Sequence, residues 1–494
     1  MKKIILNIVF ASGVLLILSS CKKDYLETNP TDQIAQSDVF KTTTNAWTAL
    51  NGIHRSLYIQ YNSRQDQGGQ SKNMIDMDML GEDLVNPTTG NGWFLTTHRW
   101  TDHRNENAWS PFFNFQFYYK IIDNANMIIA NIDNATGPDA DKKVIKGQAL
   151  AYRAWSYFQM IQLFGKRFDK TSDNSSLGLS LVLTPTRDMI PRSTVSEVYT
   201  VIVKDILDAI ALLNGAPARA NPSHINVNVA KGLRARIALT MQNWDTAAKY
   251  ASEARTGFIL MSNAQYLQGF NNYTNPEWMW GSRQQSDQTT YFYSFFAYMS
   301  ADFNSTNIRT NPKCINSALY NAIAATDVRK QLWDPTGANT AFPTPPGGTR
   351  YAYMNRKFLS GGGSSSSIGD VPNMRVAEMY LVEAEAKAKL GDEPGARTAL
   401  YNLVVNRDPS YVLSTNSGQA LINEILTHRR VELWGEGFRF YDLKRLNLPL
   451  DRTGANHNAA VAVKMSVPAG DAQWEFLIPR SELNANSKCI QNPL

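Results

Sequence analysis

The stretch LINEILTHRRVELWGEGFRFYDLKRLN, residues 421–447, combines a helical apolar pattern with many charged residues. Apolar residues recur at helical spacing before Gly435 and again after Gly437, which predicts two helices joined by a glycine turn. Charged residues crowd between bulky apolar groups at positions 424, 429, 430, 432, 436, 439, 442, 444 and 445. Because an unpaired buried charge destabilises a protein by several kcal/mol, we expect these charges to form ion pairs.

Glu432 and Glu436 could instead act as a catalytic acid and base. The neighbouring sequence supplies neither a nucleophile nor a set of metal ligands, so a structural ion network is the preferred interpretation. The set expected to pair within the stretch is Arg429, Arg430, Glu432, Arg439 and Asp442.

The whole chain has 494 residues, of which 43% are hydrophobic and 11% aromatic, so it can bury a large core. Its formal net charge is +6, but acidic and basic residues are interspersed, which argues against a nucleic-acid partner. Beyond the N-terminal segment no stretch is apolar enough to span a bilayer. Whether Cys314 and Cys489 pair is left open by the sequence.

The first twenty residues have the organisation of an export signal. Lys2 and Lys3 precede an apolar run over residues 4–18, which is shorter than the ~20 residues needed to cross a bilayer. The run ends in Leu18-Ser19-Ser20-Cys21, which resembles a bacterial lipobox. The resemblance implies cleavage before Cys21 and acylation of its thiol, which would anchor the protein to a membrane. The alternative is an ordinary secreted protein with a chance cysteine.

Three segments follow from this pattern: a signal peptide at 1–20, a polar lipidated tether at 21–38, and a single, mostly α-helical domain at 39–494. Two helix pairs, rich in alanine and joined by tight turns, resemble degenerate tetratricopeptide repeats. These pairs are 225–240 with 243–256 and 373–390 with 392–406. Two further pairs complete a predicted scaffold of four repeat-like pairs. One is 147–164 with 195–213, and the other is formed by the two helices of the stretch 421–447. Single helices are also predicted at 39–61 and 109–132.

Two regions, 62–108 and 261–372, lack helical periodicity and are predicted to be long irregular loops. The first is rich in Gly, Asn, Asp and Thr, the second contains a Gly/Ser run at 361–367, and both contain several aromatic residues. Long loops held by a rigid scaffold often carry function, so we place the candidate site there.

Several separate stretches together resemble one family. They are the lipobox Cys21, YLETNP at 25–30, GQALAYRAWSYFQMIQLFG at 147–165, MRVAEMYL at 374–381, HRRVELWGEGFRFYDLKR at 428–445, and the close with Ile478-Pro479 and Gln491-Asn492-Pro493. In combination they resemble the SusD/RagB family of nutrient-binding lipoproteins from Bacteroidetes outer membranes. The resemblance extends over essentially the whole chain after the signal.

The resemblance implies a helical fold with repeat-like pairs as scaffold and loops that form the ligand site. It also implies a lipid-anchored, non-catalytic protein without a cofactor, which captures glycans at the cell surface and serves a SusC-type TonB-dependent outer-membrane transporter as a lid. Lys22-Lys23-Asp24 departs from the acidic export tag of some relatives, so the outward orientation depends on the family resemblance.

Loop aromatics and nearby polar residues are the candidate glycan ligands, since sugar rings stack on Trp and Tyr while their hydroxyls bond to Asn, Asp and Arg. The candidates are Trp93, Trp100, Asp102, Asn105, Arg283, Tyr291 and Tyr293. No motif transfers a binding residue from the family, and core packing is the alternative for each aromatic. Trp109, at the start of a helix with Phe112, Phe113 and Phe117, is predicted to be core.

Other site types are less well supported. His98, Asp102 and His103 could suggest a metal, but their spacing is not that of a zinc site, and the acidic run at 76–83 lacks the calcium-loop pattern, so we predict no metal site. The same fold could bind peptides, as the RagB branch implies. A glycoside hydrolase would need two carboxylates about 5–10 Å apart across a cleft, and no motif indicates such a pair.

Overall fold

The computed structural model describes residues 39–285, 287 and 292–494. The signal, Cys21, the tether and Tyr291 lie outside the described residues. The described chain is mainly helical, as predicted, with a few short strands. None of its helices is both long enough and apolar enough to cross a membrane.

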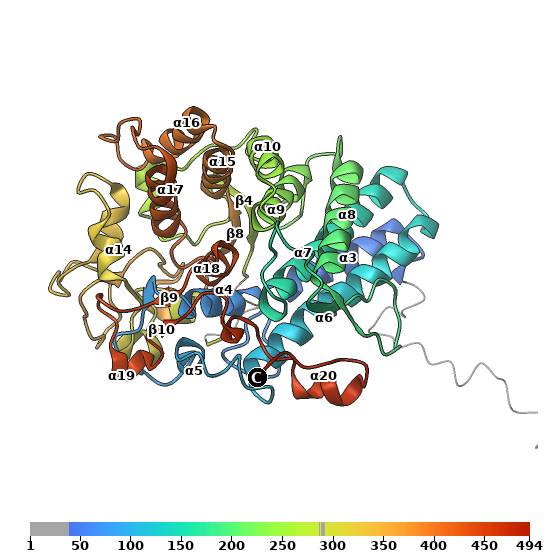
Figure 1. The fold of residues 1–494 in the computed structure, drawn as a ribbon, viewed down its shortest axis with the longest axis horizontal. Coiled ribbons are helices and arrows are strands. Elements are labelled where there is room, and N and C mark those ends of the chain that lie inside the picture. The colour runs from blue at the N-terminus through green and yellow to red at the C-terminus, as the bar shows by residue number, and fades with distance from the viewer. Residues whose placement is uncertain (1–38, 286, 288–291) are drawn as a thin grey trace, which may run out of the picture.

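Long helices carry most of the architecture. They are α3 (Thr43–Ser56), α4 (Gln70–Met79), α6 (Trp109–Asn131), α7 (Asp139–Phe164), α8 (Val195–Leu213), α9 (Val227–Thr240), α10 (Trp244–Ala254), α15 (Val376–Leu390), α16 (Glu393–Val404), α17 (Gly418–Glu432) and α18 (Arg439–Leu446). Shorter helices are α5 (Leu95–His98), α11 (Asn263–Tyr266), α12 (Phe296–Met299), α13 (Thr306–Thr310), α14 (Ser317–Asn321), α19 (Ala459–Ala462) and α20 (Arg480–Ala485). Figure 1 shows α3, α6, α7 and α8 gathered on one side, α14 and its neighbouring irregular segments on the other, and α4 and α18 between them.

Local sequence signals set the helix ends. A capping box starts α8: the Thr194 side chain accepts from the Glu197 amide, and the Glu197 carboxylate accepts from the Thr194 amide. Helix α15 ends at Gly391, which has a φ of 85°, and Asp392 then caps α16.

Consecutive helices pack as pairs, α7 on α8, α9 on α10 and α15 on α16. Ala235, Ala247, Ala384 and Ala396 are fully buried in two of these pairs. Their small side chains allow close approach of the helix backbones, which is consistent with the predicted repeat-like scaffold.

The opening stretch does not form a fourth pair of this kind. Helix α17 packs on α15 and α16, whereas α18 packs on α4. The cause lies in the glycine turn: Gly437 has a φ of 85°, and a Cβ atom there would lie 2.6 Å from the Met74 Cα of α4. The close approach therefore turns α18 away from α17 and onto α4.

The prediction of a long irregular loop at 62–108 is wrong at residues 70–79, where α4 lies. Every residue from 71 to 79 is buried, including Lys72, Asn73, Asp76 and Asp78. A helix buried on all sides shows no one-sided apolar period, and its polar residues resemble a loop composition.

The region 261–372 is built from short elements, as its irregular pattern predicts. A four-stranded antiparallel sheet has the order β1 (Leu84–Val85), β5 (Cys314–Ile315), β7 (Met354–Asn355), β6 (Trp333–Asp334). Strands β4 (Trp278–Ser282) and β8 (Val371–Arg375) pair next to α15. Outside this region, β2 (Leu177–Ser180) pairs with β3 (Arg192–Thr194), and β9 (Leu450–Asp451) pairs with β10 (Ser466–Val467). Cys314 and Cys489 are free and buried.

The charges of 421–447 are paired, but mostly with distant segments. Arg429 bonds to Asp442 within the stretch, as predicted. Arg430 and Arg439 instead pair with Asp83 and Glu82, just after α4. The prediction of a mainly internal pairing set is therefore wrong. Helix α18 packs on α4, which brings Arg439 to Glu82, and Arg430 of α17 pairs with Asp83 from the same segment after α4.

Glu432 and Glu436 join the buried ion network that the sequence predicts. Their partners are Arg329, Lys357, Arg375 and Arg407, and Glu277 also binds two of these arginines. The network connects α15 and α17 to the irregular region, so it holds the loops on the scaffold.

Candidate ligand-binding site

Arg64 is the centre of an aromatic and polar cluster on the loop that follows α3. Its guanidinium carbon lies 5.8 Å from the ring centroid of Trp93 and 4.8 Å from that of Trp109. Nε and Nη2 donate to the two carboxylate oxygens of Asp66 at 2.9 and 3.0 Å. Such a fork holds the planar guanidinium in one orientation. We call Arg64, Asp66, Trp93 and Trp109 the Arg64 cluster.

The loop reaches this position by a left-handed turn. Asn62 and Ser63 have φ values of 50° and 54°. The Asn62 amide donates to the side chains of Gln67 and Gln116, each at 2.9 Å, so the loop is attached to α6. Arg64 is thereby placed beside Trp109, the first residue of α6.

The second irregular region supports the cluster from another side. Phe94, next to Trp93, contacts the ring of Tyr298 edge to face, with centroids 4.9 Å apart. The Tyr298 hydroxyl donates to the Gln65 carbonyl at 3.0 Å. The two regions predicted to carry the site therefore meet at the Arg64 cluster.

Asp102 lies close to the cluster. Burial raises its pKa, and Lys72 opposes this rise. The charges of Asp66 and Arg64 also act on it, so Asp102 belongs to the same electrostatic environment. Asn105 is exposed three residues later, and its side-chain oxygen accepts from the Asn107 amide at 3.0 Å.

Trp100 is not available to a ligand, which corrects its assignment as a stacking residue. Its side chain is only 2% exposed, and its indole N–H donates to the Leu80 carbonyl at 3.0 Å. Its ring contacts Trp474 edge to face at 4.9 Å. The C-terminal segment, distant in sequence, therefore covers Trp100 and makes it core.

The two described candidates of the second loop region, Arg283 and Tyr293, do not join the Arg64 cluster directly. Tyr293 is 6% exposed, and its backbone lies against Gly68, so its ring offers no free face. Arg283 is exposed and lies 5.3 Å from the ring centroid of Tyr273. Arg283 thus belongs to a separate aromatic contact.

Trp109 was expected in the core, but its side chain is 46% exposed. It shares a helix face with Phe113 and Phe117, both fully buried, which is why periodicity predicts burial. As the first residue of α6 it extends past the covered part of that face. The position of Trp109 at the start of a helix was the sequence signal that could have indicated its exposure.

The histidines near this site are structural. His98 and His103 are buried, and each bonds to a backbone carbonyl, of Met79 and Gln473 respectively. Among the described residues no group of three or more His, Cys, Asp or Glu side chains could hold a metal ion.

Comparison with known proteins identifies the family. The profile of the SusD family matches residues 239–494, which is more than half of the chain. The chain belongs to the SusD family. Residues 24–239 match a second profile, described as "Starch-binding associating with outer membrane". The family resemblance drawn from the sequence is thereby confirmed.

Similar proteins extend over the whole fold. SusD-like protein P2 from Formosa agariphila is 25% identical, and the alignment covers 97% of both chains. A solved SusD-like carbohydrate binding protein from Bacteroides vulgatus is 26% identical, with a TM-score of 0.80 over 91% of this chain and 98% of that one. A laminarin binding SusD-like protein is 19% identical, with a TM-score of 0.70 over 92% of this chain and all of the other, and so shares the fold. The SusD family is a family of carbohydrate-binding proteins.

A separate groove is present in this SusD-family protein, and no member of the Arg64 cluster lines it. It lies between α3 and α6, has a volume of about 960 Å³, and includes Ile59, Lys120 and Asp123. Because α6 rises ~1.5 Å per residue, Lys120 lies roughly 16 Å along the helix from Trp109. The Lys120 ammonium is 5.2 Å from the ring centroid of Tyr61, which leads into the Arg64 loop.

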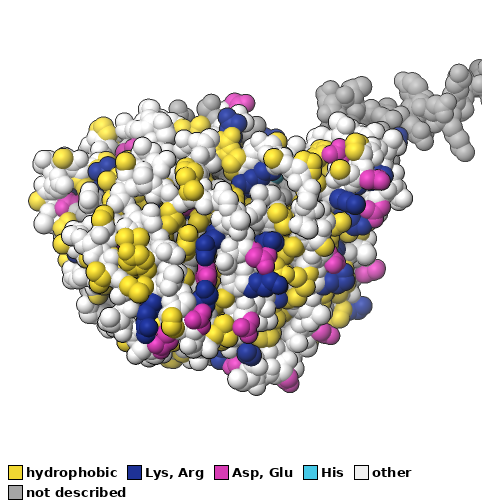
Figure 2. All heavy atoms as spheres, turned by 90° about the horizontal axis from the view of Figure 1, so that it is seen from above, with side chains coloured by type: hydrophobic (Ala, Val, Ile, Leu, Met, Phe, Trp, Pro, Cys, Tyr) yellow, Lys and Arg dark blue, Asp and Glu magenta, His cyan; other side chains and the backbone are white. Residues whose placement is uncertain are grey.

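The surface in Figure 2 carries basic and acidic side chains side by side, with apolar ones scattered between them. This face shows no broad basic patch of the kind that binds nucleic acid.

Proposed function

We propose that this SusD-family protein is a cell-surface lipoprotein that captures an oligo- or polysaccharide and delivers it to a SusC-type TonB-dependent outer-membrane transporter. The observation that carries the proposal is the Arg64 cluster, which combines an exposed indole face with an oriented guanidinium. Family membership, the outer-membrane association in the profile description and the lipobox-like Cys21 support the cellular setting.

The cluster suits a sugar for two reasons. The exposed indole of Trp109 provides an apolar face on which the C–H groups of a sugar ring can stack. The fork to Asp66 uses Nε and Nη2 of Arg64, so Nη1 can donate to a sugar hydroxyl. Trp93, Asp102 and Asn105 are the further proposed contacts.

The ligand class follows from this chemistry and from the relatives. One structural neighbour is described as laminarin binding and another as carbohydrate binding. A peptide ligand would rely more on directed backbone hydrogen bonds than on exposed aromatic faces.

The test is calorimetric titration of the soluble full chain, with Cys21 replaced by Ala, against a panel of neutral oligosaccharides and of mixed peptides. Binding of a glycan that Trp109→Ala weakens supports the proposal. Binding of peptides alone would replace it with the RagB-like alternative. Release of shorter sugars during incubation would instead indicate an enzyme.

A further inference from the structure

A pocket separate from the Arg64 cluster lies where the chain after α7, the end of α18 and the C-terminal segment meet. Its walls come from residues 166–176, 443–448 and 470–475, and we call it the Lys444 pocket. Its volume is about 360 Å³, and no member of the Arg64 cluster lines it. Since a cavity of ~150 Å³ can hold a benzene ring, this pocket has room for a sugar ring with its hydroxyls.

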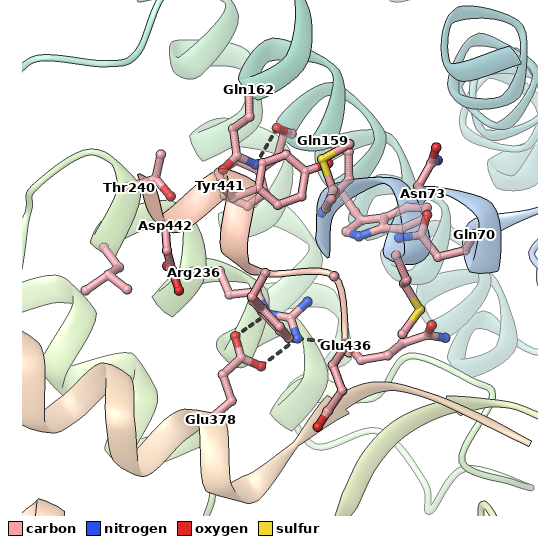
Figure 3. Close-up of a pocket in the computed structure, with 18 of the residues that line it drawn as sticks. Gln70, Asn73, Gln159, Gln162, Arg236, Thr240, Glu378, Glu436, Tyr441 and Asp442 are labelled. Atoms are coloured by element: carbon pink, nitrogen blue, oxygen red, sulfur yellow. Dashed lines mark hydrogen bonds and ion pairs between the residues drawn. The ribbon is translucent and has the colours of Figure 1, made fainter. Parts of the chain in front are cut away.

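A smaller cavity lies where α4, α7, α9, α15 and α18 meet, and Figure 3 shows the side chains around it. Its volume is about 60 Å³. Arg236 forms a bidentate pair with Glu378 at its edge, at 2.6 and 2.5 Å (Figure 3). This space is enough for ordered water and too small for a sugar ring, so it belongs to the packing of the scaffold.

One buried cation joins the three walls of the Lys444 pocket. Nζ of Lys444 donates to the carbonyls of Gln162 at 2.7 Å, Gly165 at 2.8 Å and Trp474 at 2.7 Å. Lys444 is only 7% exposed, and these bonds use all three donors of its ammonium. The end of α7, the end of α18 and the C-terminal segment are therefore held together without a ligand.

The wall formed by residues 166–176 is folded around one side chain. Oδ1 of Asn174 accepts from the Asp169 amide at 2.9 Å, and Nδ2 donates to the carbonyls of Asp169 and Ser172 at 2.9 and 3.0 Å. The backbone carbonyls of Asn174 and Ser176 accept from the first two residues of α8. The wall is thus fixed to the scaffold, which lowers the entropy that a ligand must overcome.

Glu475 supplies a carboxylate that the protein does not use. The residue is 7% exposed, and neither carboxylate oxygen accepts a hydrogen bond within the described part of the chain. These oxygens are not among the enclosed atoms without a partner, so they keep accessible surface, and the residue lines the pocket. A largely buried carboxylate with open acceptor sites favours a ligand that donates hydrogen bonds.

Other groups that line the pocket add donors. The side chains of Lys166 and Asn447 are exposed and form no hydrogen bond with another described residue. A Cβ atom at Gly470 would lie 3.6 Å from Oδ1 of Asn447, so this amide lies beside the third wall. Lys166 donates, Glu475 accepts, and Asn447 does both. A hydroxyl group also does both, so it matches each of these partners.

The charges of the pocket are nearly balanced. Arg167 pairs with Asp169 at 2.5 Å, and the charge of Glu475 acts on Lys444. A charged ligand would add a charge without its own partner in a partly buried space, which is unfavourable. A neutral ligand with several hydroxyls fits best, and Leu448, which is 37% exposed, offers apolar surface to its carbons.

We propose that the Lys444 pocket binds a neutral mono- or disaccharide, as a second carbohydrate site separate from the Arg64 cluster. Glu475 accepts from the sugar hydroxyls, Lys166 donates to them, and Asn447 does both. This site does not depend on glycan binding at the Arg64 cluster.

The test is titration of the soluble full chain, with Cys21 replaced by Ala, with glucose, galactose, xylose and maltose, followed by calorimetry and ligand-observed NMR. We expect Lys166→Ala and Asn447→Gly each to weaken binding of the best sugar about threefold to tenfold, as the loss of one hydrogen bond does. Both should keep the unfolding temperature of the parent, because neither side chain has a partner among the described residues and glycine fits the φ of 54° at position 447.

Glu475→Gln keeps the size of the side chain and removes its charge. It should weaken binding about fivefold or more, because a carboxylate accepts more strongly than an amide. If this variant loses stability, the two variants of the preceding paragraph still test the site.

Lys170→Ala is the matched control, because Lys170 is an exposed lysine of the same loop that does not line the pocket. It and Trp109→Ala should bind the sugar as the parent does. The proposal is overturned if none of the four sugars binds, if the three pocket variants bind as tightly as the parent, or if Lys170→Ala weakens binding as much as Lys166→Ala. It is also overturned if Trp109→Ala alone abolishes binding, which would place the sugar at the Arg64 cluster and leave the proposed glycan function intact.

Discussion

Arg375 donates from Nη1 to a carboxylate oxygen of Glu432 at 3.0 Å, although the two residues are 57 positions apart and both side chains are fully buried. Arg375 precedes α15, and Glu432 ends α17. Burial alone would raise the pKa of Glu432, but Arg407, Arg375 and Arg329 hold it well below its usual range. The pair is thus part of a charge network that closes the scaffold against the irregular region.

Removing Arg375 should destabilise the protein severely. Arg375→Ala leaves Glu277, Glu432 and Glu436 buried with too few counter-charges, and we expect a loss of ~3–5 kcal/mol in the free energy of unfolding. Urea unfolding followed by circular dichroism measures this loss. Arg397→Ala is the control, because Arg397 forms a partly exposed pair with Glu393 worth ~1 kcal/mol or less. Equal losses for both variants would contradict a structural role for the network.

Acid should weaken the fold through Asp442. Burial would raise its pKa, but Arg429 and Arg445 lower it to about 2. Because the folded-state pKa lies below the unfolded value of ~3.9, the carboxylate stabilises the fold by ~2 kcal/mol above pH ~4, and this is lost as the pH falls toward 2.

The measurement is the free energy of unfolding in urea at several pH values between 6 and 2.5. Asp442→Asn should be less stable at pH 6 and should lose less stability on acidification than the parent. If the free energy of unfolding of Asp442→Asn falls as steeply on acidification as that of the parent, Asp442 is not the cause of the acid sensitivity.

Trp109 and Trp100 should respond in opposite ways to truncation. Trp109→Ala should weaken glycan binding by ~1–3 kcal/mol with little change in thermal stability, because its exposed ring is the proposed stacking face for the ligand. Trp100→Ala should lower stability by ~3–5 kcal/mol through a core cavity. Calorimetry and thermal unfolding of both variants provide the comparison, and a folded Trp100→Ala protein with selectively lost binding would overturn its placement in the core.

Cys21→Ala should release the protein from membranes, since the acylated thiol is the proposed anchor. The measurement is the share of protein in the outer-membrane fraction of the native host, compared with a conservative control such as Lys22→Arg. Retention of the Cys21→Ala chain in the membrane fraction would rule out this anchor.

Much of the fold was predictable because its signals are local. The capping box at Thr194 and Glu197 and the glycine end of α15 act within a few residues, and the structure has both. Helix α4 could not be predicted in this way, because its residues are buried on every side and so lack a periodic apolar face. For the candidate site, the sequence predicted the loop region but not which of its residues are accessible. Trp93 and Asp102 lie at the Arg64 cluster, whereas Trp100 is covered by Trp474.

The sequence by itself determined the helices with one-sided apolar patterns, their caps, the glycine turn at 435–437 and the family resemblance, because each depends on residues close together in the chain or on a quoted motif. Only the tertiary structure decided that the turn directs α18 onto α4, and that Arg430 of α17 pairs with Asp83, 347 residues away. It also decided that Trp109 is exposed and Trp100 buried. Exposure and ion pairing depend on which distant segments cover a side chain, and that information is absent from local spacing.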